Sequence, residues 1–135
     1  MLAPNRPQAH ADEARDALRS LAHATRDLDD PTEIYPVLGE LTNGLASLAQ
    51  SLHQIGDFHE GPATKRAWIA GDPRTGRAAS YQVAWELHRA AEMVHQVAAT
   101  IDRAHEVEAT ITYDVHDVVA LAPVPRPTAR PGLSL

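Results

Sequence analysis

Apolar residues recur along two long segments at alternating steps of four and three residues. The first series is Ile34, Leu38, Leu41, Leu45, Leu48, Leu52 and Ile55. The second is Val83, Leu87, Ala90, Val94, Val97, Ile101 and Ala104, with Ile111, Val115 and Val118 continuing its phase. A mean spacing of 3.5 residues places each series on one side of a helix, so each side needs another helix to cover it.

These patterns predict an all-α fold, an antiparallel three-helix bundle with helices over about 8–28, 32–57 and 78–121. The third helix is much longer than the other two, so its far end should extend past them. Residues 1–7 are expected to be a flexible leader and residues 8–121 the helical domain. Four prolines among residues 122–135 predict a disordered Pro-rich tail.

Turn and capping residues divide these elements. Asp30-Pro31-Thr32-Glu33 is a typical helix start, although Pro36 could kink the first turns or be the true first residue. Glycine and proline dominate the connection between the second and third helices. Residues 109–116 allow two interpretations, because alternating Ile111, Tyr113 and Val115 also suit a strand.

The second helix carries no charged side chain between Leu41 and Gly56. A surface helix normally has charges on its outer side. We therefore expect burial on two sides, either at the centre of the monomer or in an oligomer interface. The alternative is a solvated face of Gln, Ser and Asn side chains.

Composition narrows the functional classes. The 135 residues suit one domain, and the absence of cysteine excludes disulfides and thiolate chemistry. Neither a membrane span nor a secretory signal is visible, so we expect a cytoplasmic protein without membrane contact. A net charge of −6 argues against nucleic-acid binding. Only one of the twelve basic residues is Lys, which suggests a GC-rich bacterial genome.

Histidine is unusually frequent, with eight residues. Five are followed by a carboxylate at three or four residues, the spacing of weak pairs within a helix. These pairs are His10–Glu13, His23–Asp27, His53–Asp57, His88–Glu92 and His105–Glu108.

His88, Glu92 and His95 are the candidate metal ligands, because they include the Glu-x-x-His spacing of di-iron bundles. The phase of the third helix turns Glu92 outward, however, and His53 with Asp57 is the only similar pair on the second helix. We therefore expect no resident cofactor.

Two other groups of residues are candidates for binding. Arg74 and Arg77, near the start of the third helix, could hold an anion. Trp68 is expected instead to plug the end of the bundle. Trp85 lies off the apolar series and is an interface candidate, together with Ile111, Val115 and Val118.

Two short motifs resemble the small WXG-type substrates of type VII secretion. Trp68-Ile69-Ala70-Gly71 lies between two helices, although its glycine is displaced by one position, and Tyr113 precedes Asp117 by four residues. The resemblance covers about 80 residues and implies a secreted helical hairpin with a Tyr-dependent export signal.

The sequence shows no nucleophile motif, and no pair of carboxylates lies on the apolar series. Nothing in it therefore indicates an enzyme. The sequence therefore favours a non-enzymatic interaction or accessory protein that forms homo-oligomers or binds another protein. A metal-binding bundle and a WXG-like secretion substrate are the alternatives.

Overall fold

A computed structural model of the chain describes residues 6–114. Its three helices are α1 (Pro7–Ala24), α2 (Ile34–Glu60) and α3 (Pro73–Glu108). Short 3-10 turns lie at Thr25–Asp27, Pro31–Glu33 and Pro62–Lys65. The described residues contain no strand, only an isolated bridge between Ile69 and Asp72. The expected all-helical fold with three main helices is therefore confirmed.

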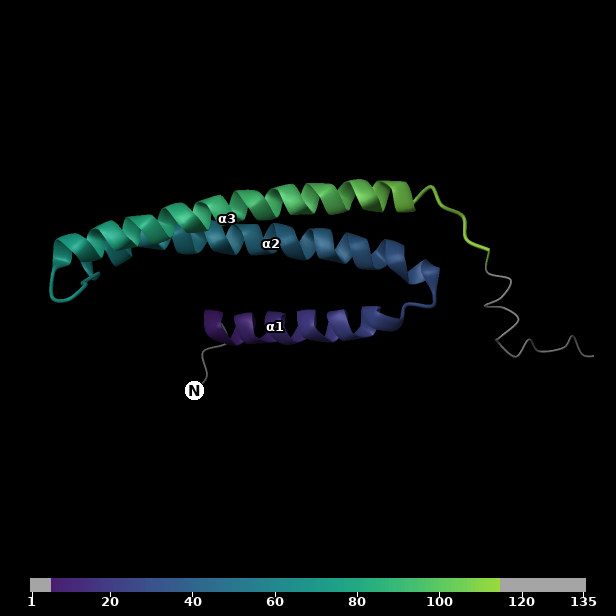
Figure 1. The fold of residues 1–135 in the computed structure, drawn as a ribbon, viewed down its shortest axis with the longest axis horizontal. Helices are drawn as coiled ribbons and strands as arrows, with labels where there is room; N and C mark the ends of the chain where they lie inside the picture. The colour runs from purple at the N-terminus through teal and green to yellow at the C-terminus, as the bar shows by residue number, and fades with distance from the viewer. Residues whose placement is uncertain (1–5, 115–135) are drawn as a thin grey trace, which may run out of the picture. The chain divides into compact units, whose positions relative to one another are not determined.

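The chain divides into two compact units, and each is described by itself. Residues 32–113 form one unit, in which α2 and α3 lie side by side and antiparallel as a helical hairpin (Figure 1). α1 belongs to the other unit. It is an exposed amphipathic helix that begins at Pro7 and ends at Ala24, and the hydroxyl of the following Thr25 donates to the Leu21 carbonyl.

The third helix begins five residues earlier than predicted, at Pro73 instead of residue 78. Asp72 caps it, since its carboxylate accepts hydrogen bonds from the Arg74 N–H and the Thr75 hydroxyl. Proline fits the first helical position, where no backbone donor is needed. The sequence contains this capping signal in the same Asp-Pro form as Asp30-Pro31, within a connection whose glycines and prolines are also typical of a turn.

The Asp72 cap makes stability depend on pH. The Thr75 hydroxyl and then the Arg74 N–H hold the pKa of the Asp72 carboxyl below its ordinary value. Because the folded pKa is lowered, this stabilisation is complete above the unfolded pKa, about 3.9, and is lost as the pH falls through the folded value. Thermal melts should therefore show Asp72→Ala below the wild type at pH 7, with a smaller difference at pH 3. An equal difference at both pH values would contradict the charged cap.

The third helix also ends earlier than predicted, at Glu108 instead of residue 121. The Thr110 hydroxyl donates to the Val107 carbonyl, and β-branched residues follow. Residues 111–114 form neither helix nor strand, so neither interpretation of this segment holds within the described part. The rest of the predicted helix, the leader up to residue 5 and the tail at 122–135 lie outside the described residues.

α2 begins close to the predicted position, with Ile34 as its first residue. Pro36 is therefore the third residue of the helix. The first four backbone N–H groups of a helix have no partner within it, so proline removes no hydrogen bond there.

Small side chains lie between α2 and α3. The buried apolar residues of the hairpin are Ala49 in α2 and Ala84, Ala91 and Ala98 in α3. Gly56 is also buried in α2. Among the described residues no large side chain is fully buried. The two helices therefore approach each other along alanine and glycine, with half-buried Leu45, Leu52, Leu87 and Val94 beside them.

This arrangement corrects the predicted inward faces by one residue. Val83 and Val97 immediately precede Ala84 and Ala98, and they were expected to face inward. They are instead 41% and 49% exposed. In α2, Leu48 and Ile55 precede Ala49 and Gly56 in the same way and are 44% and 48% exposed.

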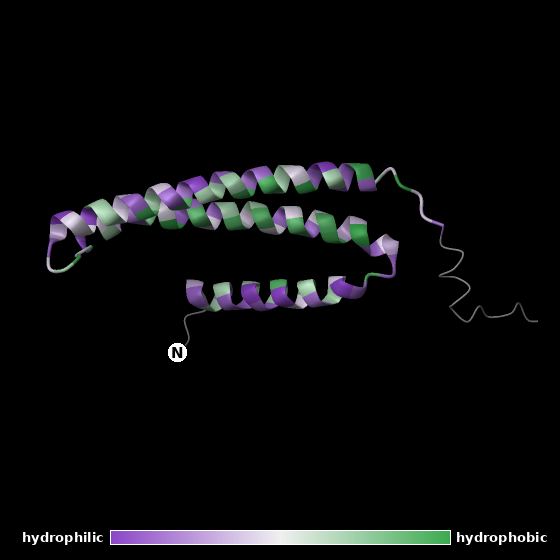
Figure 2. Ribbon diagram, viewed as in Figure 1, coloured by the Kyte–Doolittle hydropathy of each residue, from purple (hydrophilic) through white to green (hydrophobic). Residues whose placement is uncertain are grey.

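These four residues, Leu48, Ile55, Val83 and Val97, define what we call the apolar face. The two helices run in opposite directions. In such a pair, residues that immediately precede a buried residue in either helix lie on the same side of the hairpin. Figure 2 shows apolar and polar residues alternating along the helices, as amphipathic helices require.

No helix of the described part of the chain is long and apolar enough to cross a membrane.

Candidate functional site

Histidines and carboxylates line the edge of the hairpin opposite the apolar face. Asp57 and Glu92 immediately follow the buried Gly56 and Ala91, and are therefore offset from the interface toward the other side. We call this the polar edge and define it by His53, Asp57, Glu60, His88 and Glu92.

Two histidine rings meet across the polar edge. Nδ1 of His53 lies 2.7 Å from Nδ1 of His88, at hydrogen-bond distance. The other ring nitrogen of His53, Nε2, lies 3.2 Å from Oε1 of Glu92. Each imidazole therefore contacts the opposite helix through two polar atoms.

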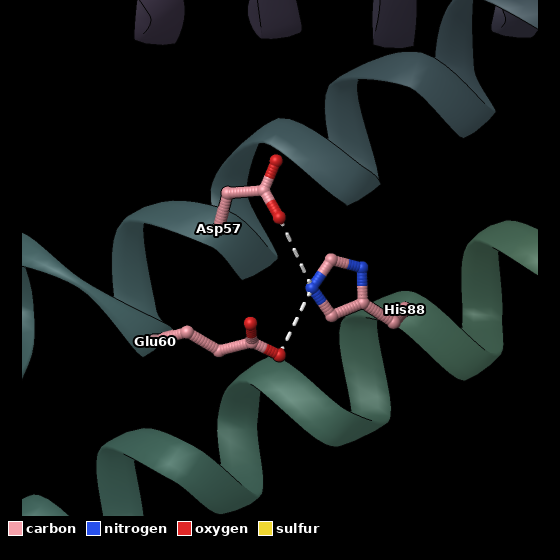
Figure 3. Close-up of side chains that lie close together, drawn as sticks. All are labelled: Asp57, Glu60 and His88. Carbon is pink, nitrogen blue, oxygen red and sulfur yellow. Dashed lines mark ion pairs between the residues drawn. The ribbon is translucent and has the colours of Figure 1, made fainter.

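The outer nitrogen of His88 faces two carboxylates of α2. Its Nε2 lies 3.4 Å from Oδ1 of Asp57 and 3.2 Å from Oε1 of Glu60. Figure 3 shows the ring nitrogen directed between the two carboxylate groups, with one oxygen on either side. Both are close contacts between a ring nitrogen and a carboxylate oxygen.

Glycine at position 56 makes room for the His88 ring. A Cβ atom there would lie 2.8 Å from Nε2 and 2.9 Å from Cε1 of His88. Gly56 thus sets how closely the imidazole lies against α2, and His88 is only 27% exposed as a result.

The predicted metal ligands are not brought to one point. His88, Glu92 and His95 lie along the polar edge, but Glu92 pairs with His53, and the ring centroid of His95 lies 6.2 Å from that of His53. The set of potential ligand atoms that converges among the described residues is Asp57, Glu60 and His88. Sequence reasoning identified His88, His53 and Asp57, and missed Glu60.

The expected pairs within each helix are largely exchanged for pairs between helices. His53 and Asp57 were expected to pair, as were His88 and Glu92. In the structure His53 instead contacts Glu92, while His88 contacts Asp57. The His10–Glu13 pair in α1 forms as expected, with 3.8 Å between Nδ1 and Oε2.

Two other histidines also join the helices. His105 stacks on Tyr35 with ring centroids 3.9 Å apart, close to Gly39. At the opposite end, the hydroxyl of buried Ser80 donates to the His59 carbonyl and lies 3.1 Å from His59 Nδ1. Histidine contacts therefore fix the register of the hairpin at its two ends and in its middle.

A scan against models of known protein families finds no match, and searches of curated proteins and of solved structures find no significantly similar protein.

The hairpin turn carries a shallow hollow of about 430 Å³, lined by Phe58, Trp68, Ile69, Gly76 and Val83, among others. Trp68 does not plug the end of the hairpin, as was expected, but is 62% exposed. Ala70 and Gly71 both have positive φ, as a tight two-residue hairpin turn requires, so the Trp68 segment folds back on itself before α3 begins.

The candidate anion site lies at the first turn of α3. Arg74 and Arg77 are both exposed there. The Arg74 N–H donates to the Asp72 carboxylate, which thus already places a negative charge at this helix end. Anion binding by the two arginines stays a prediction.

The structure describes two of the four interface candidates, Trp85 and Ile111. Trp85 is exposed, with the Arg89 guanidinium 5.4 Å from its ring centroid. Ile111 is exposed beyond the end of α3, whereas Val115 and Val118 lie outside the described residues.

Tyr113 follows α3, and its hydroxyl donates to Glu108, which raises the pKa of the phenol. Asp117, the other half of the secretion-like motif, lies outside the described residues.

Proposed function

We propose that this protein is a non-enzymatic interaction protein whose hairpin associates with a second copy of the chain through the apolar face. One observation carries the proposal. Four large apolar side chains, those of Leu48, Ile55, Val83 and Val97, lie half exposed on one side of the hairpin, while the residues buried between the helices are small: alanine, glycine and Ser80.

Burial of these side chains supplies the free energy of association. Each Leu, Ile or Val transferred from water to an apolar contact contributes about 1.5–3 kcal/mol when fully buried. Leu48, Ile55, Val83 and Val97 have lost only part of their exposure in the hairpin. A two-helix unit gains little from packing alanine on alanine, so covering the apolar face is the main stabilisation still available to it.

A second copy of the hairpin suits this face because the face is uncharged. The protein has a net charge of −6, so two copies repel each other at long range. Between Leu41 and Gly56, however, α2 has no charged side chain, so the α2 half of the face can meet a partner without desolvating a charge. The product would be a four-helix arrangement with the polar edges outside.

Light scattering on the full chain tests the proposal. We expect the wild type to have twice the mass of one chain and to dissociate on dilution. Leu48→Glu and Val97→Glu should each give a monomer, because a carboxylate would be buried unpaired in the interface. The neighbouring substitution Ser47→Glu, on an exposed position outside the face, should leave the dimer intact.

Circular dichroism would confirm that each variant remains helical. A wild type that stays monomeric at all concentrations would contradict association between copies. That outcome would favour burial of the apolar face by α1 of the same chain, as in the predicted three-helix bundle, or by a different protein. Equal disruption by Ser47→Glu would contradict the apolar face as the contact.

A further inference from the structure

Two imidazole rings and three carboxylates form a row of contacts along the polar edge. Three contacts join its groups in a row: Glu92 to His53, His53 to His88, and His88 to Asp57 with Glu60. Each contact needs one proton or one cation between its electron pairs. Two neutral imidazoles supply only two N–H groups, so the third contact is completed by a further proton or by a cation.

The His88 end of the row is the better place for a cation. If the His53 Nε2–H donates to Glu92, then His53 Nδ1 accepts from the His88 Nδ1–H. The remaining lone pair, on His88 Nε2, then faces two carboxylate oxygens. In the opposite tautomer a lone pair of His53 faces the single carboxylate of Glu92. A positive ion is better placed at the His88 end, where it meets two negative charges instead of one.

The distances at this end suit a small divalent metal ion. Zn²⁺ binds imidazole nitrogen and carboxylate oxygen at about 2.0–2.2 Å in a tetrahedron, in which neighbouring ligand atoms lie about 3.3–3.6 Å apart. The distances from His88 Nε2 to Asp57 and Glu60 are 3.4 and 3.2 Å. The three ligand atoms lie within 4.8 Å of one another.

Both carboxylates can adjust to an ion. The side chains of Asp57 and Glu60 are 72% and 50% exposed, so a small rotation brings their oxygens together without disturbing the helices. The imidazole, in contrast, is held on two sides, by Gly56 and by the hydrogen bond to His53. A fixed nitrogen ligand with two adjustable oxygen ligands is a workable metal site.

We propose that Asp57, Glu60 and His88 bind one Zn²⁺ ion per chain, with His88 Nε2 as the nitrogen ligand and a fourth position open to water. His53 and Glu92 support the site from behind, since they hold His88 in the tautomer that leaves Nε2 free. A histidine that binds a metal usually donates its other ring N–H to an acceptor that fixes its orientation. Here that acceptor is His53, whose own orientation is set by Glu92.

The bound ion would join α2 to α3. Two of its ligands come from the last turn of α2 and the third from the middle of α3. Metal binding should therefore stabilise the hairpin, since a ligand that binds only the folded state raises its stability. The imidazole ligand favours Zn²⁺ over Mg²⁺, which prefers oxygen ligands and retains its water.

Isothermal titration of the untagged full chain with ZnCl₂, and with MgCl₂ in parallel, tests the site. We expect one Zn²⁺ per chain, a melting temperature that rises with Zn²⁺, and no response to Mg²⁺. His88→Ala should abolish binding. His53→Ala should weaken it about 10–100-fold, as the loss of a supporting partner does elsewhere.

His95→Ala is the matched control, because His95 lies on the same edge of α3 but is not among the converging ligands. It should bind Zn²⁺ as the wild type does. Glu60→Gln should reduce affinity strongly while keeping the helix, which circular dichroism would verify. Equal losses in His95→Ala and His88→Ala would overturn this ligand set, and so would wild-type chain that takes up no Zn²⁺ or binds Mg²⁺ equally well.

Discussion

Replacing Gly76 by alanine is expected to destabilise the hairpin by about 1–3 kcal/mol, the usual cost of forcing an extra methyl group into a filled space. Gly76 lies in the first turns of α3, where the connection from α2 crosses it. A Cβ atom at this position would lie 2.0 Å from the carbonyl oxygen of Ala67 and 2.5 Å from the Trp68 nitrogen. These are backbone atoms, so the turn itself has to move.

The reverse result is expected at Gly44, which provides a matched control. Gly44 lies within α2, and a Cβ atom there would meet nothing within 4 Å. Alanine loses less backbone entropy than glycine on forming a helix, so Gly44→Ala should stabilise the protein by about 0.5–1 kcal/mol.

Urea denaturation of the two variants beside the wild type measures the contrast. The midpoint should fall for Gly76→Ala and rise for Gly44→Ala. If Gly76→Ala were as stable as the wild type, the close passage of the turn over α3 would be wrong.

Replacing Ala91 by leucine should destabilise the hairpin by about 1–3 kcal/mol as well, for a different reason. Ala91 is fully buried between the two helices, near the middle of α3. Three further methyl-sized groups cannot be accommodated at an alanine contact unless the helices separate, and separation would break the close His53–His88 contact beside it.

Ala99→Leu, on an exposed position of the same helix, is the comparison. It should change the free energy of unfolding by less than about 0.5 kcal/mol. Thermal or urea unfolding of both variants distinguishes the two positions. A similar small effect at Ala91 would contradict the alanine interface and would favour the larger apolar residues as the true contact.

The proposed association through the apolar face and the proposed Zn²⁺ binding at the polar edge can be tested separately, because they would use opposite sides of the hairpin. Leu48→Glu should prevent dimers and leave Zn²⁺ binding intact, whereas His88→Ala should do the reverse. Each variant thus serves as a control for the other.

The two ends of α3 show how well local sequence signals predict where a helix begins and ends. Asp72-Pro73 marks the start of α3 as clearly as any residue pair in the chain, and it was missed because turn residues surround it. The end of α3 at Glu108 was partly foreseen in the competing strand pattern at Ile111 and Tyr113. The ends of a helix can therefore be predicted from the local sequence, provided that capping residues are given more weight than continued periodicity.

The candidate site was predictable only in part. His88 and Glu92 were identified from their spacing along one helix, as were His53 and Asp57. Their actual partners are exchanged between α2 and α3. Spacing reports neighbours within a helix, whereas a contact across two helices depends on their register, which the three histidine contacts along the hairpin help to fix.

The sequence by itself determined that this chain is helical, that it has three main helices, and that α2 and α3 are amphipathic, because an apolar spacing of 3.5 residues is that of a helix with one apolar side. It did not determine the two ends of α3. Only the tertiary structure decided which side of each helix is covered. Leu87 and Val94 belong equally to a series with Val83 and Val97 and to one with Ala84 and Ala98. Hydrophobicity favours the first series, but close approach of two helices favours the second, since small side chains let the backbones come nearest. The larger side chains are thereby left at the apolar face.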